Sequence, residues 1–433
     1  MACEQPALVY RPTNRNRDVV DQTSRGLAQN TGFILITEFV VQLTRAGTIF
    51  VLFDQFSEFD SGRYAALLAL TGLLRPVSQW GMNHVAARAV ALGVPFASIW
   101  AKVTTAIYVG GTVGTGAAVL FAWQLYDVAL WIVLVVSISQ LIGLSTAQAA
   151  SLMTEAHHRS DIGLKINIAG AVVRITLLLL FVGLGFDQLS EWALFLLAGM
   201  FLWGTGASLQ VARAFNGGTF RFLSPTRQDL RHGFGFVFVQ TSANGQTDID
   251  KVVLEANGLT VDTANYAPGF RIAEMATIPL IALVRATYAE FFRRGQSTIS
   301  ASMAFARKLT QFSAVYGVLA GLGLFFLAPL VTLVIDESKL TEVVDVVRWL
   351  SFIPLVKGLQ YFPGNALTGS DNHNIRSAII FVTASVNLIA NLLLIPQFGW
   401  RAAAVTTLLS ESLFAVLLWL AVFALARRER LDA

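Results

Sequence analysis

The stretch VALWIVLVVSISQLIGLSTAQAASLM, residues 128–153, carries no charged side chain. A helix needs about 20 mostly apolar residues to cross the hydrocarbon core of a bilayer, so this stretch predicts a membrane-spanning helix. The whole chain of 433 residues has the same character, with 55% hydrophobic residues, 13% charged residues and a mean hydropathy of +0.61. Soluble domains carry about 25% charged residues. We therefore predict an all-α, polytopic membrane protein.

Twelve apolar stretches of this kind follow one another with short connections, and the sequence defines their boundaries to within several residues. The predicted spans are residues 27–53, 64–83, 96–123, 128–153, 162–186, 189–212, 232–257, 264–292, 305–335, 341–369, 374–396 and 400–426. They predict a six-helix N-terminal lobe at residues 27–212 and a six-helix C-terminal lobe at residues 232–426. A linker at residues 213–231 joins the lobes, and tails occupy residues 1–26 and 427–433.

The orientation follows from the connections, because Lys and Arg accumulate on the cytoplasmic side of short loops. With the N-terminus inside, the predicted inner segments hold 20 Lys and Arg residues and the outer segments hold only Arg63, Lys339 and Arg401. The two tails and the linker are therefore expected in the cytoplasm. The net charge of +4 is spread between the spans and forms no single patch, so nucleic acid is not expected as a partner.

An internal repeat relates the two predicted lobes. The pattern D-x-x-x-Y occurs at Asp60 and Tyr64 after the first span, and again at Asp262 and Tyr266 after the seventh. Six spans separate the copies, so both halves share one orientation and would be related by an axis along the membrane normal. Such a pseudo-two-fold arrangement predicts a central cavity between the lobes.

Charged side chains remain inside the spans, where each costs roughly 2.5 to 3.5 kcal/mol or more at the bilayer centre. The cations are Arg45, Arg75, Arg174, Lys251, Arg271, Arg285, Arg348 and Lys357. The acids are Glu38, Asp248, Asp250, Glu274, Glu290, Asp345 and Glu411. They are expected to face a wet cavity or one another.

Three of these cations, Arg45, Arg75 and Arg174, have no acid within one turn of their own helix, which favours a place on a cavity. Asp250 and Arg271 lie at similar distances from the turn near residue 260, so they could meet across the hairpin.

The other acids of the seventh and eighth spans could form local pairs. Asp248 and Lys251 are three residues apart, as are Arg271 and Glu274, a spacing that places side chains on one helix face. Structural pairing and a role in ion coupling both stay open for Glu38, Asp248, Asp250, Lys251 and Glu274.

The sequence lacks two common motifs of nucleotide-binding proteins and hydrolases. It contains neither a phosphate-binding G-x-x-x-x-G-K-[ST] loop nor a G-x-S-x-G nucleophile elbow. The neighbouring His157 and His158 lack the helical i, i+4 spacing of a zinc site. We predict no catalytic residues, no metal and no cofactor, and a transporter in place of an enzyme.

Three stretches and the twelve-span frame carry a resemblance to a known family. They are FDSGRYAALLALTGLLRPVSQWGMNHVAAR from Phe59, QTDIDKVVLEANGLTVDTANYAPGFRIAEM from Gln246, and FPGNALTGSDNHNIRSAIIFVTASVNLIANLLLIPQFGWRAAAVTTLLSE from Phe362. The last contains the run N-x-x-x-N-x-x-x-I-P-x-x-G. Together they resemble the Wzx-type polysaccharide and O-antigen flippases of the multidrug/oligosaccharidyl-lipid/polysaccharide exporter superfamily. Trp400 departs from the small residues common at that place in the family.

The resemblance implies an inner-membrane flippase that moves a polyprenyl-diphosphate-linked oligosaccharide to the outer leaflet for surface polysaccharide synthesis, such as O-antigen, lipopolysaccharide or exopolysaccharide. It also implies polysaccharide polymerase and chain-length machinery as partners, and a cavity formed largely by the first, second, seventh and eighth spans. The charged residues on those spans are Glu38, Arg45, Arg75, Asp248, Asp250, Lys251, Arg271, Glu274, Arg285 and Glu290.

Our hypothesis is that four arginines attract the diphosphate or acidic sugars, because the guanidinium fork suits phosphate and carboxylate. They are Arg45, Arg75, Arg174 and Arg271. The first alternative is a cation-coupled multidrug exporter of the same superfamily, for which an acidic cavity is expected. A second alternative is a membrane glycan polymerase or ligase, for which a large outer loop is expected; the longest predicted outer loop has about ten residues.

Overall fold

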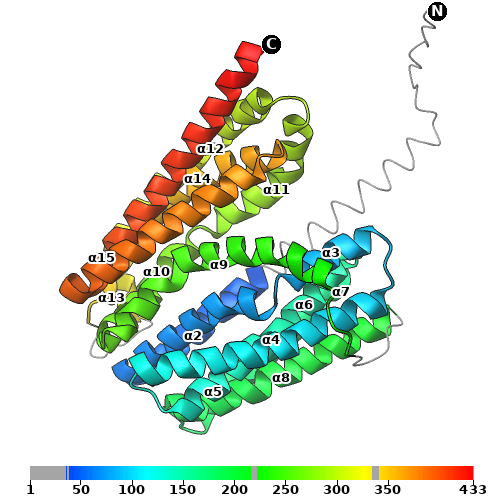
Figure 1. Cartoon of the computed structure of the whole chain (residues 1–433). Coiled ribbons are helices and arrows are strands. Elements are labelled where there is room, and N and C mark those ends of the chain that lie inside the picture. The colour runs from blue at the N-terminus through cyan, green and yellow to red at the C-terminus, as the bar shows by residue number, and fades with distance from the viewer. Residues whose placement is uncertain (1–35, 37–38, 216–221, 334–340, 433) are drawn as a thin grey trace, which may run out of the picture.

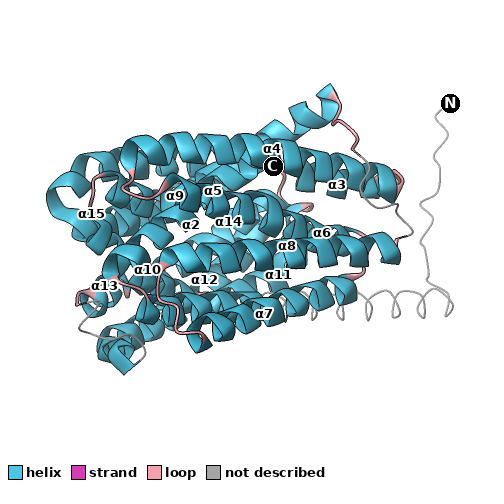
Figure 2. Ribbon diagram, turned by 90° about the horizontal axis from the view of Figure 1, so that it is seen from below, coloured by secondary structure: helices cyan, strands magenta, loops and turns pink. Residues whose placement is uncertain are grey.

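The computed structural model of the chain describes residues 36, 39–215, 222–333 and 341–432, and within these ranges every regular element is a helix (Figures 1 and 2). The first described helix runs over residues 39–55. The others are α2 Glu58–Ser78, α3 Met82–Ala91, α4 Phe96–Leu125, α5 Leu130–Ile138, η1 Ser139–Leu144, α6 Ser145–Ala156, α7 Ser160–Gly183, α8 Leu189–Ala214, α9 Arg227–Ala256, α10 Thr260–Met275, α11 Ile278–Gly295, α12 Ile299–Leu327, η2 Ala328–Leu333, α13 Val343–Leu350, α14 Ile353–Gly369 and α15 His373–Asp432.

Most of these helices overlap the predicted spans, and several predicted spans consist of shorter helices in series. The α3 helix is the exception, since it lies almost entirely in the connection predicted between residues 83 and 96. The α5, η1 and α6 helices continue one another through a π-helical segment, whereas α10 and α11 are bent by 45° relative to each other. Among the described residues, six helices are long and apolar enough to cross a membrane, or seven if the bent pair is one span. The chain is therefore a polytopic helical membrane protein, and the number of twelve spans stays a prediction.

The long helix α15 is interrupted at Gly399, whose φ of 57° and ψ of −139° are not helical. This positive φ favours glycine, because a side chain there would be strained. A Cβ at Gly399 would also lie 2.0 Å from Oδ2 of Asp262. The break divides α15 at the boundary expected between the last two spans.

The two segments of α15 are joined by buried amide side chains of the N-x-x-x-N run. Asn387 donates 2.9 Å to Oγ of Ser410, and Asn391 donates 3.0 Å to Oδ1 of Asn387. Thr406 donates to Oδ1 of Asn391. In an apolar medium such amide and hydroxyl bonds hold neighbouring helices together, so this run has a structural explanation.

Figure 1 shows α2 to α8 gathered in one bundle and α11, α12, α14 and α15 in another, with α9 and α10 between them. The α9 helix packs against α2 on one side and α15 on the other, and α10 packs against α2 and α13. The two bundles therefore meet along α2, α9 and α10. The exact limits of the predicted lobes stay a prediction, and residues 216–221 of the predicted linker lie outside the described ranges.

Candidate functional site

A cavity of about 330 Å³ lies where the two bundles meet. Its walls come from the helix at residues 39–55, from η1, α2, α7 and α8 of the first bundle, and from α9 and α10. Its polar and charged lining residues are Arg45, Thr48, Tyr64, Arg75, Gln140, Arg174, Trp192, Asn244, Thr247, Asp248, Lys251, Arg271 and Glu274. The resemblance implied walls from the first, second, seventh and eighth spans; η1, α7 and α8 add to them.

The α2 helix presents one face to the cavity and lets α9 approach closely. Tyr64, Leu68, Gly72 and Arg75 recur at three- and four-residue spacing along this face. A Cβ on Gly72 would lie 3.3 Å from Oδ2 of Asp248, and Asn244 donates 2.9 Å to the carbonyl oxygen of Gly72. The small residue therefore brings the polar face of α9 against α2.

All four arginines predicted for substrate binding, Arg45, Arg75, Arg174 and Arg271, line this one cavity. With Lys251 they make five cations, against the carboxylates of Asp248 and Glu274, so the described lining has a net charge of +3 when all are ionised. Such a lining attracts anions and repels cations. The structure thus brings the predicted residues together, while their binding of a substrate stays a proposal.

Two of these arginines carry a charge that the protein does not neutralise by contact. Across the described ranges, neither Arg75 nor Arg174 forms an ion pair, and Nε of Arg75 is buried without a hydrogen bond. Asp248 interacts with Arg75 through space. A partly buried cation of this kind is costly unless another charge compensates it, so an anionic ligand would be stabilised here.

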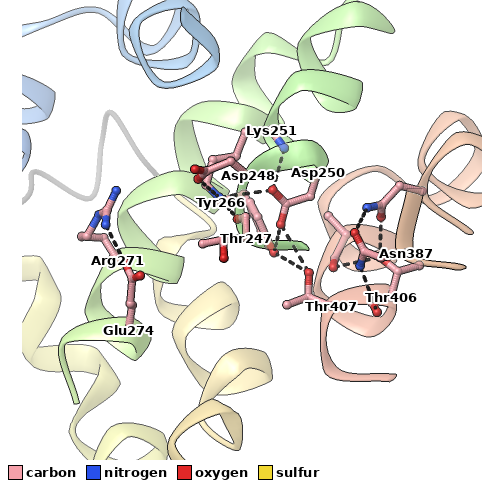
Figure 3. Close-up of polar contacts among 12 residues, drawn as sticks. Thr247, Asp248, Asp250, Lys251, Tyr266, Arg271, Glu274, Asn387, Thr406 and Thr407 are labelled. Carbon is pink, nitrogen blue, oxygen red and sulfur yellow. Dashed lines mark hydrogen bonds and ion pairs between the residues drawn. The ribbon is translucent and has the colours of Figure 1, made fainter. Parts of the chain in front are cut away.

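Lys251 lies between two carboxylates of α9 (Figure 3). Its ammonium is 3.3 Å from Asp248, as the three-residue spacing predicted, and 3.2 Å from Asp250. It also donates 2.7 Å to the carbonyl oxygen of Thr247 and lies 4.0 Å above the ring of Phe270. This set of contacts holds Lys251 at one edge of the cavity.

Asp250 points away from the cavity, which corrects the expectation that it meets Arg271 across the hairpin. Its side chain, 1% exposed, accepts 2.6 Å from the hydroxyl of Tyr266 and 3.3 Å from Thr407. Arg271 instead pairs with Glu274 at 2.5 Å, one turn along α10 (Figure 3). The expectation compared only the depth of the two residues in the membrane. Residues at equal depth meet only if the rotation of each helix about its axis also points them toward one another.

The remaining intramembrane charges lie elsewhere. Glu38 is outside the described residues. Arg285 and Glu290, which the resemblance placed on cavity spans, are not among the lining residues, and Glu290 binds Arg293 and Arg294 at the end of α11. A further pair, Lys357 with the buried Glu411 at 2.5 Å, lies outside the cavity lining.

The lining also contains residues that the sequence did not assign to the cavity. Tyr64 and Trp192 are almost fully buried, at 3% and 2% exposure, and the indole Nε1 of Trp192 has no hydrogen-bond partner among the described atoms. Gln140 reaches the cavity from the π-helical segment. Gln140 is one of two amides in an otherwise apolar span, and Tyr64 belongs to the D-x-x-x-Y repeat, whereas no local pattern marks Trp192.

No group of His, Cys, Asp and Glu in the described ranges could hold a metal ion. The cavity therefore offers charge, hydrogen-bond donors and aromatic faces. These groups can bind and release a polar solute.

Solved structures with the same fold are transporters. The chain has a TM-score of 0.69 with an inward-facing multidrug resistance MATE family transporter of the MOP superfamily, at 11% identity over 89% of this chain and 96% of that one. It has a TM-score of 0.62 with a MOP superfamily transporter from Pyrococcus furiosus, at 13% identity over 94% and 96%. A eukaryotic MATE transporter gives 0.59, at 13% identity over 95% and 99%. The chain therefore shares its fold with these transporters.

The sequence itself identifies the family. Residues 27–291, which cover more than half of the chain, match the family described as "Polysaccharide biosynthesis protein". The chain belongs to this family. No curated protein sequence matches it. The family is thus one of polysaccharide biosynthesis, and the fold is one that solved transporters adopt.

Proposed function

We propose that the protein is a flippase that moves a polyprenyl-diphosphate-linked oligosaccharide from the cytoplasmic to the outer leaflet of the inner membrane. The observation that carries the proposal is the cationic cavity, in which five cations and two carboxylates line about 330 Å³ between the bundles. The diphosphate is an anion, and arginine binds phosphate through two parallel N–H donors. Membership of a polysaccharide biosynthesis family supports a glycan as the cargo.

In this proposal the chain has twelve spans, two lobes of six helices and both termini in the cytoplasm. Arg45, Arg75 and Arg271 attract the diphosphate, and the lobes rock to expose the cavity to either side. Asp250 and Lys251 have a structural role, since both are buried and bonded to each other. A coupling role is kept for Asp248 and for Glu38, and export by this route would deliver glycan to polymerase and chain-length machinery.

The main alternative is a multidrug exporter, the activity named for several proteins of the same fold. A surplus of cations in the cavity disfavours cationic drugs. One structural neighbour, the Pyrococcus furiosus transporter, is itself described as having a binding pocket of reverse polarity that suggests a different function. That description supports the view that the charge of the binding pocket determines which class of solute a transporter of this fold carries.

A deletion strain tests the proposal. We expect lipid-linked oligosaccharide to accumulate on the cytoplasmic leaflet while surface polysaccharide falls, and the intact gene to restore both. Arg45→Ala or Arg271→Ala, expressed at normal level, should fail to restore export. Unchanged glycan and lipid pools combined with altered drug sensitivity would instead establish the multidrug exporter.

A further inference from the structure

The two halves of the chain touch where the start of α2 passes the turn between α9 and α10. A Cβ on Gly62 of α2 would lie 2.1 Å from the carbonyl oxygen of Thr260, so the backbones are in contact there. The hydroxyl of Thr260 donates 3.2 Å to Oε1 of Glu255, close to the end of α9. In the proposed orientation this contact of Gly62 with Thr260 and Glu255, here called the outer seam, lies on the outer side of the membrane.

Glu255 is a buried carboxylate that lacks a contacting cation. It is 2% exposed, and its second oxygen, Oε2, has no hydrogen-bond partner among the described atoms. Arg63 of α2 acts on this carboxylate through space, but its guanidinium is bonded to Asp127 at 2.9 Å. Nε of Arg63 and the hydroxyl of the neighbouring Tyr126, which also interacts with Glu255, are buried without partners as well. The outer seam thus holds polar groups that do not satisfy one another.

The charge of Glu255 decides whether its burial is favourable. The charged groups that face it are Arg63 from α2 and Asp127 from the connection between α4 and α5, and these two cancel in their own ion pair. An ionised Glu255 therefore adds a net charge of −1 to a contact that excludes water, which is costly. A protonated carboxyl is neutral and can donate a hydrogen bond to a hydroxyl such as that of Tyr126.

A second close contact, between the other end of α2 and the start of α9, is built differently. A Cβ on Gly81 would lie 2.4 Å from the carbonyl oxygen of Gly233. The indole of Trp80 donates 3.0 Å to the carbonyl oxygen of Leu230. These four residues carry no ionisable side chain. Of the two contacts, only the outer seam can therefore be strengthened or weakened by a proton on one of its own residues.

We propose that Glu255 is a proton-operated latch on the outer side of the protein. When it carries a proton, its carboxyl is buried against α2 and the outer ends of the two halves stay together. When the proton leaves, the carboxylate gains water only if α2 separates from the turn between α9 and α10, which opens the cavity outward. The proposal rests on the rocking of the lobes in the proposed function. It adds the residue through which protons from outside set the balance between the two states.

Distances between spin labels measure this balance without any cargo. The labels are placed at Ala129 and Thr341, which are exposed in outer connections of the two halves. The protein is full-length, and Cys3→Ser removes its single cysteine. We expect a short distance at about pH 5 and a second, longer distance that becomes more populated toward about pH 9. For one coupled proton, the ratio of the two populations changes by up to about tenfold per pH unit.

Variants assign the pH response to Glu255. Glu255→Gln keeps an oxygen acceptor for Thr260 but cannot ionise, so it should show the short distance at every pH. Glu255→Asp should restore a pH-dependent distance. Asp187→Asn is the matched control, because it removes an exposed carboxylate from another outer connection, and it should behave like wild type.

Two results would overturn the latch: a wild-type distance distribution that does not change with pH, or a Glu255→Gln variant that keeps the wild-type pH response. Both would leave the flippase standing, because the labels report opening of the outer side and not the solute that is moved. Conversely, unchanged glycan and lipid pools in the deletion strain would overturn the flippase, while a pH response lost in Glu255→Gln would still support the latch.

Discussion

Asp262 accepts a hydrogen bond of 2.9 Å from the backbone N–H of Trp400, the residue that follows the break in α15. In the other half of the chain Asp60 accepts 3.1 Å from the backbone N–H of Leu189, the first residue of α8. Each aspartate thus joins the start of one helix to the start of another 129 or 138 residues later. The two members of the D-x-x-x-Y repeat make the same kind of contact, which supports the proposed two-fold relation between the halves.

Removal of either aspartate should destabilise its own half. Asp60→Ala and Asp262→Ala each leave a helix-start N–H without its acceptor, which costs about 1 to 2 kcal/mol. Thermal unfolding of the purified protein measures the change. Asp345→Ala is the control, because its pair with Arg348 at 3.4 Å is exposed and worth little. Equal melting temperatures for all three variants would contradict the role given to the repeat.

Gly399 should tolerate no side chain. Gly399→Ala adds a Cβ to a residue with positive φ and places it 2.0 Å from Oδ2 of Asp262, so the aspartate must move and its bond to Trp400 is lost. We expect a loss of at least about 2 kcal/mol in the free energy of unfolding.

A matched control exists in α12. Gly323 is helical, and a Cβ added there would have no neighbouring atom within 4 Å, so Gly323→Ala should leave stability unchanged or raise it by up to about 1 kcal/mol. Denaturant or thermal unfolding of both variants measures the change in stability. An unchanged stability of Gly399→Ala would contradict the prediction, because it would show that the backbone at this position can relax.

The ion pair between Asp229 of α9 and Lys102 of α4 should make the stability of the fold depend on pH. Asp229 accepts 2.7 Å from Lys102 and also caps α9 with Thr226. Burial raises the pKa of Asp229, but hydrogen bonds from Lys102 and Thr226 outweigh burial, so the net pKa lies below its usual value. A carboxyl whose pKa is lowered on folding stabilises the fold above its unfolded pKa, and this contribution is lost as pH falls through the folded value.

Asp229→Asn should therefore cost about 1 kcal/mol at pH 7. The difference from wild type should shrink as the pH falls below about 3.9, the unfolded pKa. Melting temperatures from pH 7 downward measure both effects. If Lys102→Met causes no further loss of stability when it is added to Asp229→Asn, the effect belongs to this ion pair. If the stability difference between wild type and Asp229→Asn is the same at every pH, titration of Asp229 does not contribute to it.

The sequence predicted more of the helices and cavity cations than of the contacts between them. Long apolar runs are local signals, so most described helices could be placed within several residues. The α3 helix, Met82–Ala91, was not expected, because it lies almost entirely in a predicted connection. Arginines without a nearby acid, such as Arg75 and Arg174, could also be assigned to a cavity, since few other environments in a bilayer accept them.

Contacts between distant helices carry no such signal. The bond between Asp250 and Thr407 joins residues 157 positions apart, and it depends on the rotation of α9, which depth counting does not give. Trp192 reads as an ordinary apolar residue, so its place on the cavity emerged only from the packing of α8. No sequence pattern indicated the π-helical segment that carries Gln140.

Flipping in proteoliposomes tests the central claim, that cavity cations recognise the diphosphate, most directly. Vesicles containing wild type, Arg75→Gln, Arg271→Gln or the surface control Arg293→Gln would receive lipid-linked oligosaccharide, and an impermeant periodate reagent would report its transfer between leaflets. We predict at least a tenfold slower transfer for the two cavity variants, about 1.4 kcal/mol or more, and an unchanged rate for Arg293→Gln. Transfer at the wild-type rate by both cavity variants would contradict the account.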